Sequence, residues 1–302
     1  MQPRIQLPAY AKINLGLRVL GKRPDGYHEI ETFFLQVDLA DHLFFQLLPE
    51  PGIRFSCNWP ELSEAENNLC VKACRLLEKI AGYSFGVDIY LEKNIPFGAG
   101  LGGGSSDAAV TLMAVNSLFN INLPREELGK LAIQIGSDVT FFLHGGFAYA
   151  AGRGEILTPL DYLPEVWALI VKPDVSVSTK WAYDNLKFGL TNSKKNTTFA
   201  SLKNSLSGSD KLREVCHNDM EEAVFSRYPE VAAIKSRLQD VGAFPVSMTG
   251  SGSAIFGIFE TQHALREGLR VFGKSYRTFV ARPIRSGMEQ VLQHFTAATS
   301  GG

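Results

Sequence analysis

The sequence predicts a protein of the α+β class, organised as two domains. Its 302 residues suffice for one large domain or for two domains of ordinary size, at roughly 150 residues each. Stretches with the two-residue alternation of strands and stretches with the 3.6-residue spacing of helices occur in both halves of the chain. The composition changes at residues 160–164. We therefore expect domains at residues 1–160 and 161–302.

The first quarter of the chain is predicted to be mostly β. Residues 13–19 are apolar at every second position, which is typical of a strand with one buried face. Residues 21–28 are rich in turn-forming types and separate this strand from another at 30–37. Two shorter strands are expected at 43–48 and 53–57.

Helices and strands are mixed from residue 67 onward. Apolar residues at helical spacing predict a helix over 69–80, with Asn68 as its N-cap and Gly82 just past its end. A half-buried strand at 87–91 leads into a glycine-rich loop. The remaining elements expected before residue 160 are a helix from 105 to about 119, a helix at 124–135 and a hairpin at 146–157 that turns at Gly152-Arg-Gly154.

The second half begins with a strand at 166–171. Residues 191–210 are rich in Ser, Thr, Asn and Lys and are predicted to form a mobile surface excursion. The tail from Thr296 is expected to be loose. The elements expected after the excursion are helices near 212–226 and 230–240, strands at 246–248 and 254–259, a helix to 272 and a strand at 277–283.

The charge balance argues against polyanionic partners. Thirty Lys and Arg residues oppose thirty-one Asp and Glu residues, giving a net charge of -1. No global field therefore draws the protein to nucleic acid or to an anionic membrane. No apolar run approaches the roughly 20 residues that span a bilayer, and charged residues interrupt the first twenty positions. We expect a cytoplasmic protein.

Cysteine and histidine usage predicts neither disulfides nor a metal centre. The six histidines show no paired metal-ligand spacing. The four cysteines lack a second ligand pair at zinc spacing and are expected to be reduced, structural thiols: Cys57, Cys70, Cys74 and Cys216.

The strongest sequence signal for a functional site lies in residues 96–107. Five glycines occur there within seven positions, directly before a predicted helix. Without Cβ atoms, such a backbone can approach a phosphate closely and direct several N–H groups at its oxygens. The helix N-terminus adds partial positive charge. Ser105 and Ser106 can cap the helix or bind phosphate. The alternative of a flexible linker is disfavoured because a regular strand and a strong helix flank the loop.

Several kinds of phosphate loop can be compared with this one. A Walker A loop needs a Lys after the glycines, and none is present. Gly98, Gly100 and Gly103 satisfy G-x-G-x-x-G, which keeps a dinucleotide oxidoreductase open. That match is weakened because the preceding strand alternates, and because Glu126 and Glu127 begin a predicted helix instead of ending a strand. The protein-kinase motif sets are missing.

The loop at 96–107 resembles the central motif of the GHMP small-molecule kinases. Ala11-Lys-Ile-Asn14 and Met248-Thr-Gly-Ser-Gly-Ser253 resemble their flanking motifs, so the resemblance covers nearly the whole chain. Residues 23–30 and 136–139 resemble the subgroup that acts on a cytidyl diphosphate of methylerythritol, in the non-mevalonate isoprenoid pathway. The resemblance implies an N-terminal domain like ribosomal protein S5 domain 2, a ferredoxin-like C-terminal domain and an active site in the cleft between them.

The function implied by this resemblance is ATP-dependent phosphorylation of the 2-hydroxyl group of that substrate. The alternatives are another GHMP-type alcohol kinase and the dinucleotide oxidoreductase. The implied cofactors are ATP and Mg²⁺, with the ion held mainly by phosphates and water. The implied partner is the small-molecule cytidyl diphosphate, without nucleic acid or membrane.

The resemblance also implies residue roles. Asp138 would receive the hydroxyl proton, with helix N-capping as its alternative role, and Lys12 would pair with it. Asn68 and Lys93 would lie on the adenine side, with a helix cap and a surface charge as their alternatives. The phosphates would contact Phe97, Gly98, Ala99, Gly100, Leu101, Gly102, Gly103, Gly104, Ser105, Ser106 and Asp107.

On the substrate side, the resemblance implies that Tyr27 and His28 meet the cytosine. A surface turn is the alternative for this pair. Tyr183 is expected to close the other face of the base, with Trp181 as the second choice. The residues implied near the rest of the substrate are Asn14, Thr249, Gly250, Ser251 and Gly252, where the glycine turn could also be purely structural.

Overall fold

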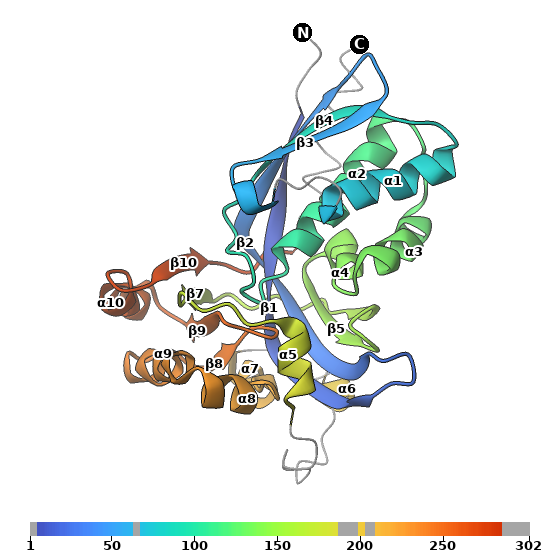
Figure 1. The fold of residues 1–302 in the computed structure, drawn as a ribbon. Helices are drawn as coiled ribbons and strands as arrows, with labels where there is room; N and C mark the ends of the chain where they lie inside the picture. Colours follow the sequence, from blue (N-terminus) through green and yellow to red (C-terminus); the bar gives the residue numbers. More distant parts are fainter. Residues whose placement is uncertain (1–4, 63–66, 187–198, 203–208, 286–302) are drawn as a thin grey trace.

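Two β-sheets packed face to face form the centre of the molecule, and helices cover the outer face of each sheet (Figure 1). The structure, a computed structural model, describes residues 5–62, 67–186, 199–202 and 209–285. The inner faces of the two sheets share one apolar core, which includes Ile13, Phe33 and Phe256. The described chain therefore has four layers: helices, sheet, sheet and helices.

The first sheet has six strands in the order β3-β4-β2-β5-β6, with β1 paired along β2. β1 and β2 are antiparallel over nearly their whole lengths. The predicted strands at 30–37 and 43–48 are one continuous strand, because pairing with β1 carries β2 across the polar residues between them. The bounds are β1 Ile5–Lys22, β2 His28–Leu47, β3 Gly52–Cys57, β4 Gly86–Glu92, β5 Phe147–Ala151 and β6 Ile156–Pro159.

The middle of β1 differs from its prediction as a strand with one buried face. Residues 11–17 are all buried. One side of this stretch packs on the second sheet, as Ile13 does, while Lys12 and Asn14 face the glycine-rich loop and its surroundings. A sequence pattern cannot predict this second cover, because it comes from residues more than 80 positions away.

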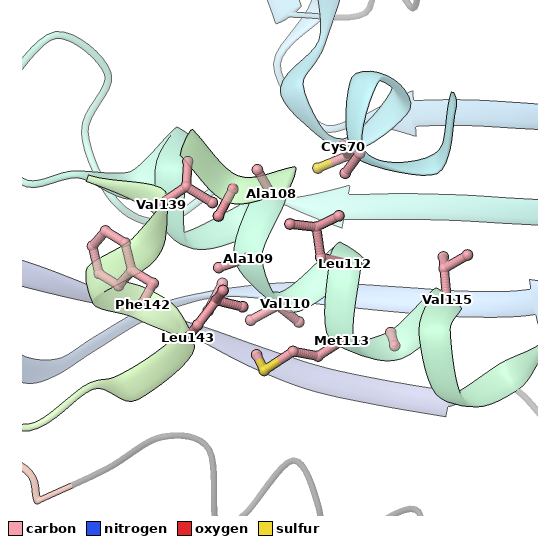
Figure 2. Close-up of a cluster of buried hydrophobic side chains, with 14 of the residues drawn as sticks. Cys70, Ala108, Ala109, Val110, Leu112, Met113, Val115, Val139, Phe142 and Leu143 are labelled. Atoms are coloured by element: carbon pink, nitrogen blue, oxygen red, sulfur yellow. The ribbon is translucent and has the colours of Figure 1, made fainter. Parts of the chain in front are cut away.

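Four helices cover the outer face of the first sheet: α1 Leu69–Ala81, α2 Gly103–Leu118, α3 Arg125–Ile135 and α4 Val139–His144. α1 begins as predicted, with Cys70 N donating to the Asn68 side chain at 2.9 Å, and ends at Gly82 in the left-handed conformation. α2 is enclosed by its neighbours, and Figure 2 shows its apolar side chains meeting α4. Gly102 is the N-cap of α2, so the expected caps Ser105 and Ser106 instead lie inside the helix.

The second sheet is antiparallel in the order β10-β7-β9-β8. Apolar side chains of α8, α9 and α10 pack on its outer face. Apart from the helix predicted over 212–226, the predicted strand and helix positions in this half are confirmed to within a few residues. The bounds are β7 Trp167–Lys172, α8 Glu221–Arg227, α9 Pro229–Asp240, β8 Val246–Met248, β9 Ile255–Phe259, α10 Gln262–Phe272 and β10 Arg277–Ala281.

The predicted helix over 212–226 is broken in two. α7 (Ser209–Val215) and α8 are separated by an extended passage that lies beside β1. Leu17 N donates to His217 O at 2.6 Å, and Asp219 N donates to Leu17 O at 3.0 Å. These bonds to a distant strand replace helical bonds, which is why local spacing misses the break.

Two short helices were not predicted: α5 (Thr179–Asp184) and α6 (Phe199–Leu202). Helices this short carry little periodic signal. The predicted surface excursion at 191–210 lies largely outside the described residues, as does the tail from Thr296. At Phe199 the prediction of a surface position is wrong, because this ring is fully buried in the core between the sheets.

Two expectations from composition can also be compared with the structure. All four cysteines are free thiols, and Cys70 and Cys74 are buried. Within residues 5–62, 67–186, 199–202 and 209–285, no helix has both the length and the apolar character needed to cross a bilayer.

Candidate active site

A pocket of about 310 Å³, here called the central pocket, opens beside the glycine-rich loop. Its wall combines segments that lie far apart in the sequence: β1, the loop before α2, the start of α4, the turn between β5 and β6, α5, and the turn after β8. The polar residues on this wall are Lys12, Asn14, Lys93, Ser105, Asp138, Arg153, Thr179, Tyr183 and Ser251. The loop that the sequence predicts to bind phosphate thus lies at the wall of a concave pocket.

The glycine loop, residues 97–104, lines the central pocket with every one of its residues. Gly100 has a φ of +76°, and a Cβ on it would lie 1.9 Å from Thr249 O. Gly102 has a φ of +71° and is the N-cap of α2, so the last two residues of the loop form the first turn of that helix. Only glycine fits this path. The loop therefore presents backbone N–H groups and a helix N-terminus to the pocket, an arrangement suited to phosphate.

Three residues expected to bind the nucleotide do not line the central pocket: Asn68, Ser106 and Asp107. Asn68 caps α1. Ser106 and Asp107 are buried in α2. Lys93 does line the pocket, but it is buried and not the surface charge considered as its alternative.

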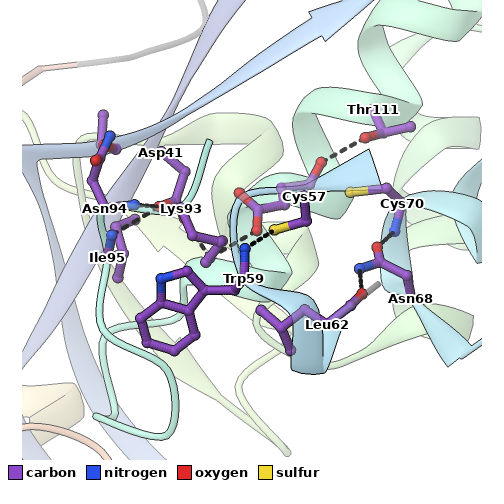
Figure 3. A network of polar contacts seen from close by, with 12 residues as sticks. Asp41, Cys57, Trp59, Leu62, Asn68, Cys70, Lys93, Asn94, Ile95 and Thr111 are labelled. Carbon is purple, nitrogen blue, oxygen red and sulfur yellow. Dashed lines mark hydrogen bonds and ion pairs between the residues drawn. The ribbon is translucent and has the colours of Figure 1, made fainter. Parts of the chain in front are cut away.

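Lys93 joins two buried carboxylates behind the glycine loop (Figure 3). Its Nζ donates to Asp41 Oδ2 at 2.5 Å and to Asp107 Oδ2 at 2.9 Å. Asp41 Oδ1 also accepts from the backbone N–H groups of Asn94 and Ile95, at 2.6 and 2.8 Å. The cluster ties β2, the start of the loop and α2 together. Sequence analysis missed Asp41, since nothing near it in the chain marks it.

The protonation of this cluster is set by burial and by its neighbours. Burial raises the pKa of Asp107 to about 8, aided by the nearby Asp41 and opposed by Lys93. Burial alone would lower the pKa of Lys93, but the carboxylates of Asp107 and Asp41 outweigh it and raise that pKa. Asp107 Oδ1 is buried with no hydrogen-bond partner in the structure. Protonation of the Asp107 carboxyl is therefore easier in the folded protein than in water.

Lys12 and Asp138 meet at the wall of the central pocket, where Lys12 Nζ lies 3.5 Å from Asp138 Oδ2. Lys12 also donates to Asn14 Oδ1 at 2.5 Å and to Gly100 O at 2.9 Å. Burial lowers the pKa of Lys12, and the charge of Asp138 opposes this shift. Asp138 precedes α4 but makes no side-chain cap bond there. Its carboxylate, 32% exposed, is available to a group in the pocket.

Asn14 and Thr249 link β1 to the glycine loop and to the turn after β8. Thr249 Oγ1 accepts from Asn14 N at 3.0 Å and donates to Gly100 O at 3.0 Å. Thr249 is fully buried and, like Gly252, does not line the central pocket, whereas Asn14, Gly250 and Ser251 do. The turn therefore has both the structural role considered for it and a face toward the pocket.

Asn218 holds this turn from the other side. Its Nδ2 donates to Met248 O at 2.7 Å and to Gly250 O at 2.9 Å, and its Oδ1 accepts from Met220 N at 2.9 Å. The residue is buried. Sequence analysis missed Asn218 because it placed this position inside a helix.

Of the aromatic residues expected at the base site, one lines the central pocket and the others lie beside it. His28 stacks on Tyr183, with ring centroids 4.6 Å apart and planes at 13°. Tyr183 lines the pocket, whereas Trp181 packs on Tyr228 and does not. Tyr27 is 55% exposed and, like His28, lies outside the pocket wall. Of the two candidate rings on α5, the geometry thus favours Tyr183.

Arg153 is a pocket residue that sequence analysis did not single out. It occupies the hairpin turn between Gly152 and Gly154, both with positive φ. The sequence did contain a signal for this residue. A charged side chain between two turn glycines lies at the tip of a tight turn, where it can reach a ligand.

The fold excludes the dinucleotide oxidoreductase. Dinucleotide folds have a mostly parallel sheet with helices on both faces. Here β4, the strand before the glycine loop, is antiparallel to β2, and the inner face of the sheet packs on a second sheet.

Two protein-family models match the chain. The model for the GHMP kinases N terminal domain matches residues 68–146, and the model for the GHMP kinases C terminal domain matches residues 199–278. The first of these ranges contains the glycine loop and Asp138, and the second contains the turn after β8. The fold and the site thus define an ATP-dependent small-molecule kinase of the GHMP class.

Curated relatives narrow this class. A protein of Chlorobium luteolum is 43% identical over 93% of this chain and 98% of its own length, and one of Prosthecochloris aestuarii is 42% identical over 90% and 95%. Both are named 4-diphosphocytidyl-2-C-methyl-D-erythritol kinase. The chain belongs to this family.

Solved structures agree. A crystal structure of 4-(cytidine 5'-diphospho)-2C-methyl-D-erythritol kinase superposes with a TM-score of 0.77 at 36% identity, over 92% of this chain and 98% of that one. Homoserine kinase from Cytophaga hutchinsonii superposes with a TM-score of 0.73 at 20% identity, over 95% and 97%, and shows a shared fold.

Proposed function

We propose that this kinase transfers the γ-phosphoryl group of ATP to the 2-hydroxyl group of 4-diphosphocytidyl-2-C-methyl-D-erythritol, in the non-mevalonate route to isoprenoid precursors. One observation carries the proposal. A single pocket joins a phosphate-type glycine loop, the Lys12–Asp138 pair and the aromatic ring of Tyr183. These three parts suit a nucleotide phosphate, an attacking hydroxyl and a nucleobase at the far end of the acceptor.

On the nucleotide side, we propose that residues 97–105 contact the ATP phosphates through the backbone and Ser105. Asn68, Ser106, Asp107 and Lys93 then act mainly by holding the loop and α1 in place. The contacts in support are the cap bond of Asn68 and the hydrogen bond that Lys93 donates to Asp107.

In the chemical step, the acceptor hydroxyl oxygen forms a bond to the γ-phosphorus while the bond from that phosphorus to the ADP oxygen breaks. Asp138 receives the hydroxyl proton, and Lys12 keeps Asp138 ionised and oriented. The 3.5 Å contact between these residues supports the pairing. A loose transition state asks little of the base, so much of the rate comes from placing the hydroxyl in line with the phosphate.

ATP chemistry also brings Mg²⁺, which neutralises phosphate charge when bound. Among the described residues, no group of three or more His, Cys, Asp or Glu side chains could hold a metal. Asp138 and Ser105 are oxygen donors on the pocket wall. Mg²⁺ takes oxygen ligands and keeps several water molecules, and two protein oxygen donors alone do not complete its six positions. We therefore propose that the ion is held mainly through phosphates and water.

On the acceptor side, we propose that Tyr27, His28 and Tyr183 bind the cytosine. Burial and the charge of nearby Lys22 lower the pKa of His28. A neutral imidazole has one donor and one acceptor nitrogen, as reading a base edge requires. Asn14, Gly250 and Ser251 border the sugar-alcohol end, with Thr249 and Gly252 behind them.

We also keep residues 1–160 and 161–302 as the two proposed domains, and a cytoplasmic location as a prediction from the sequence. The absence of a strand shared between the two sheets supports this division within the described chain.

The test of the base site compares the cytidyl substrate with its uridyl analogue. Rings alone would bind any base, since stacking is worth about 1–3 kcal/mol whichever base is bound. Hydrogen bonds to the cytosine edge must therefore supply the preference. We expect the unmodified enzyme to prefer the cytidyl substrate by kcat/KM, His28→Ala to relax this preference, and Tyr27→Ala to weaken affinity while leaving ATP affinity near normal.

Tyr83→Ala is the matched control, because Tyr83 is 51% exposed, similar to Tyr27, and lies outside the central pocket. Equal use of the cytidyl and uridyl substrates by the unmodified enzyme would refute the base site and leave only a GHMP-type alcohol kinase.

A further inference from the structure

Arg153 is held at the central pocket by a rigid turn. Gly152 and Gly154 have φ values of +73° and +110°, which keep the turn between β5 and β6 tight. Ile30 N donates to Gly152 O at 2.7 Å, so the turn is fixed to the start of β2. The same strand begins at His28, and the turn therefore lies next to the proposed base site.

The guanidinium group of Arg153 lies over the ring of Tyr27, and Arg153 lines the same pocket as the reacting groups. Its central carbon is 4.5 Å from the ring centroid of Tyr27. A Cβ on the adjacent Gly154 would lie 3.7 Å from Asp138 Oδ1, so the turn also lies close to Asp138, the proposed proton acceptor. The Arg153 side chain is only 21% exposed and lines the same pocket as Asp138.

The described wall of the central pocket carries three Lys or Arg side chains, and they differ in how fully they are engaged. Lys12 contacts Asn14, Gly100 and Asp138, and Lys93 contacts two carboxylates. The ion pair of the Arg153 guanidinium is a long one, with Nε 3.8 Å from Glu155 Oε1. A guanidinium has five N–H donors in a planar fork suited to phosphate oxygens. Arg153 is therefore the wall cation with the most unused donor capacity.

We propose that Arg153 binds the diphosphate that links the cytidine to the sugar alcohol in the acceptor substrate. This inference rests on the proposed function, because only an acceptor with a base at one end and a reacting hydroxyl at the other places a diphosphate between them. The stacking on Tyr27 orients the planar fork, and the charge of the diphosphate selects this acceptor over uncharged alcohols. Arg153 is thus a binding and specificity residue of the acceptor site.

The test separates phosphate recognition from base recognition. Calorimetric binding of CDP, CMP and cytidine is measured for the unmodified protein, Arg153→Gln and Arg153→Lys. We expect the unmodified protein to bind CDP more tightly than cytidine, and Arg153→Gln to weaken CDP about 10- to 100-fold, the effect of losing a charge-assisted hydrogen bond, with cytidine little changed. Arg153→Lys keeps the charge and should retain part of the difference.

Steady-state kinetics give the second measurement. Arg153→Gln should raise the KM for the cytidyl substrate while the KM for ATP and kcat stay near normal. Arg282→Gln is the matched control, because its guanidinium also lies 4.5 Å from an aromatic ring, that of Trp167, but outside the central pocket.

Three outcomes would overturn the inference, and they are distinguishable. If Arg153→Gln weakens ATP and not CDP, the guanidinium serves the nucleotide phosphates. If CDP and cytidine weaken equally, Arg153 only supports Tyr27. If the unmodified protein binds none of the cytidine ligands, the proposed function itself fails, and the role of Arg153 fails with it.

Discussion

Lys12 is the residue on which the proposed chemistry depends most. It is buried and reaches Asn14 and Gly100 at shorter distances than it reaches Asp138. Burial lowers the pKa of this lysine, and the charge of Asp138 opposes that shift. The pair should therefore act as one unit.

We expect Lys12→Met and Asp138→Asn each to lower kcat by about 10² to 10⁴, the range of general acid–base groups, with smaller effects on KM. The double variant should be little worse than the worse single variant, because each change removes the same unit. Steady-state kinetics on all three variants measure this. ATP binding and thermal unfolding are the folding controls, since Lys12→Met leaves polar partners at Asn14 and Gly100. Fully multiplicative losses in kcat would show that the two residues work independently.

At the scale of single elements, helix α2 contains a buried carboxyl group with a strongly raised pKa, that of Asp107. Asp107 lies in its second turn, buried against Lys93 and Asp41, and burial raises the pKa of Asp107 to about 8. The ordinary value is 3.8, so between these values the folded protein binds a proton that the unfolded chain releases. The contribution of Asp107 to the free energy of unfolding should thus fall as the pH rises from about 4 to about 8, by at most ~1.4 kcal/mol per pH unit.

Asp107→Asn removes this titration while keeping the shape of the side chain. We expect the urea midpoint of the unmodified protein to fall more between pH 6 and pH 8 than that of the variant. Asp240→Asn, at the exposed end of α9, is the control and should behave like the unmodified protein. Equal pH dependence in all three proteins would contradict the raised pKa of Asp107.

Elements with a complete local signal could be predicted from the sequence. α1 has an N-cap, an apolar stripe and a terminal glycine, and its bounds were predicted to within one residue. The glycine loop and the hairpin at β5 and β6 also carry their own turn chemistry. By contrast, the break before α8 and the continuity of β2 arise from bonds to β1, which no local pattern contains.

The candidate site divides in the same way. Lys12, Asp138 and the glycines lie in recognisable motifs, whereas Asp41 and Asn218 act through contacts with residues 30 or more positions away. Arg153 is an intermediate case. The sequence predicted the turn that contains it, but not that its side chain lines the pocket. The geometry that joins these residues exists only after the sheets have packed.

The central pocket is a product of the whole molecule. The two sheets share the core that buries Ile13, Phe33 and Phe256, and this core brings the turn after β8 against the glycine loop. Residues from both halves of the chain therefore line the one pocket. In the function proposed above, a long acceptor would lie with its hydroxyl group at the glycine loop and its nucleobase near Tyr183.

The central claim is tested most directly by the choice of phosphoryl acceptor. The enzyme is incubated with ATP, Mg²⁺ and, separately, the cytidyl diphosphate of methylerythritol, its uridyl analogue, homoserine, mevalonate and simple polyols. ADP release is measured, and phosphorus NMR identifies the phosphorylated position. We predict efficient ADP release with the cytidyl substrate alone, and a product that carries the new phosphate on the 2-hydroxyl group. Comparable turnover of homoserine, mevalonate or a polyol, or a phosphate at another position, would contradict the proposed function.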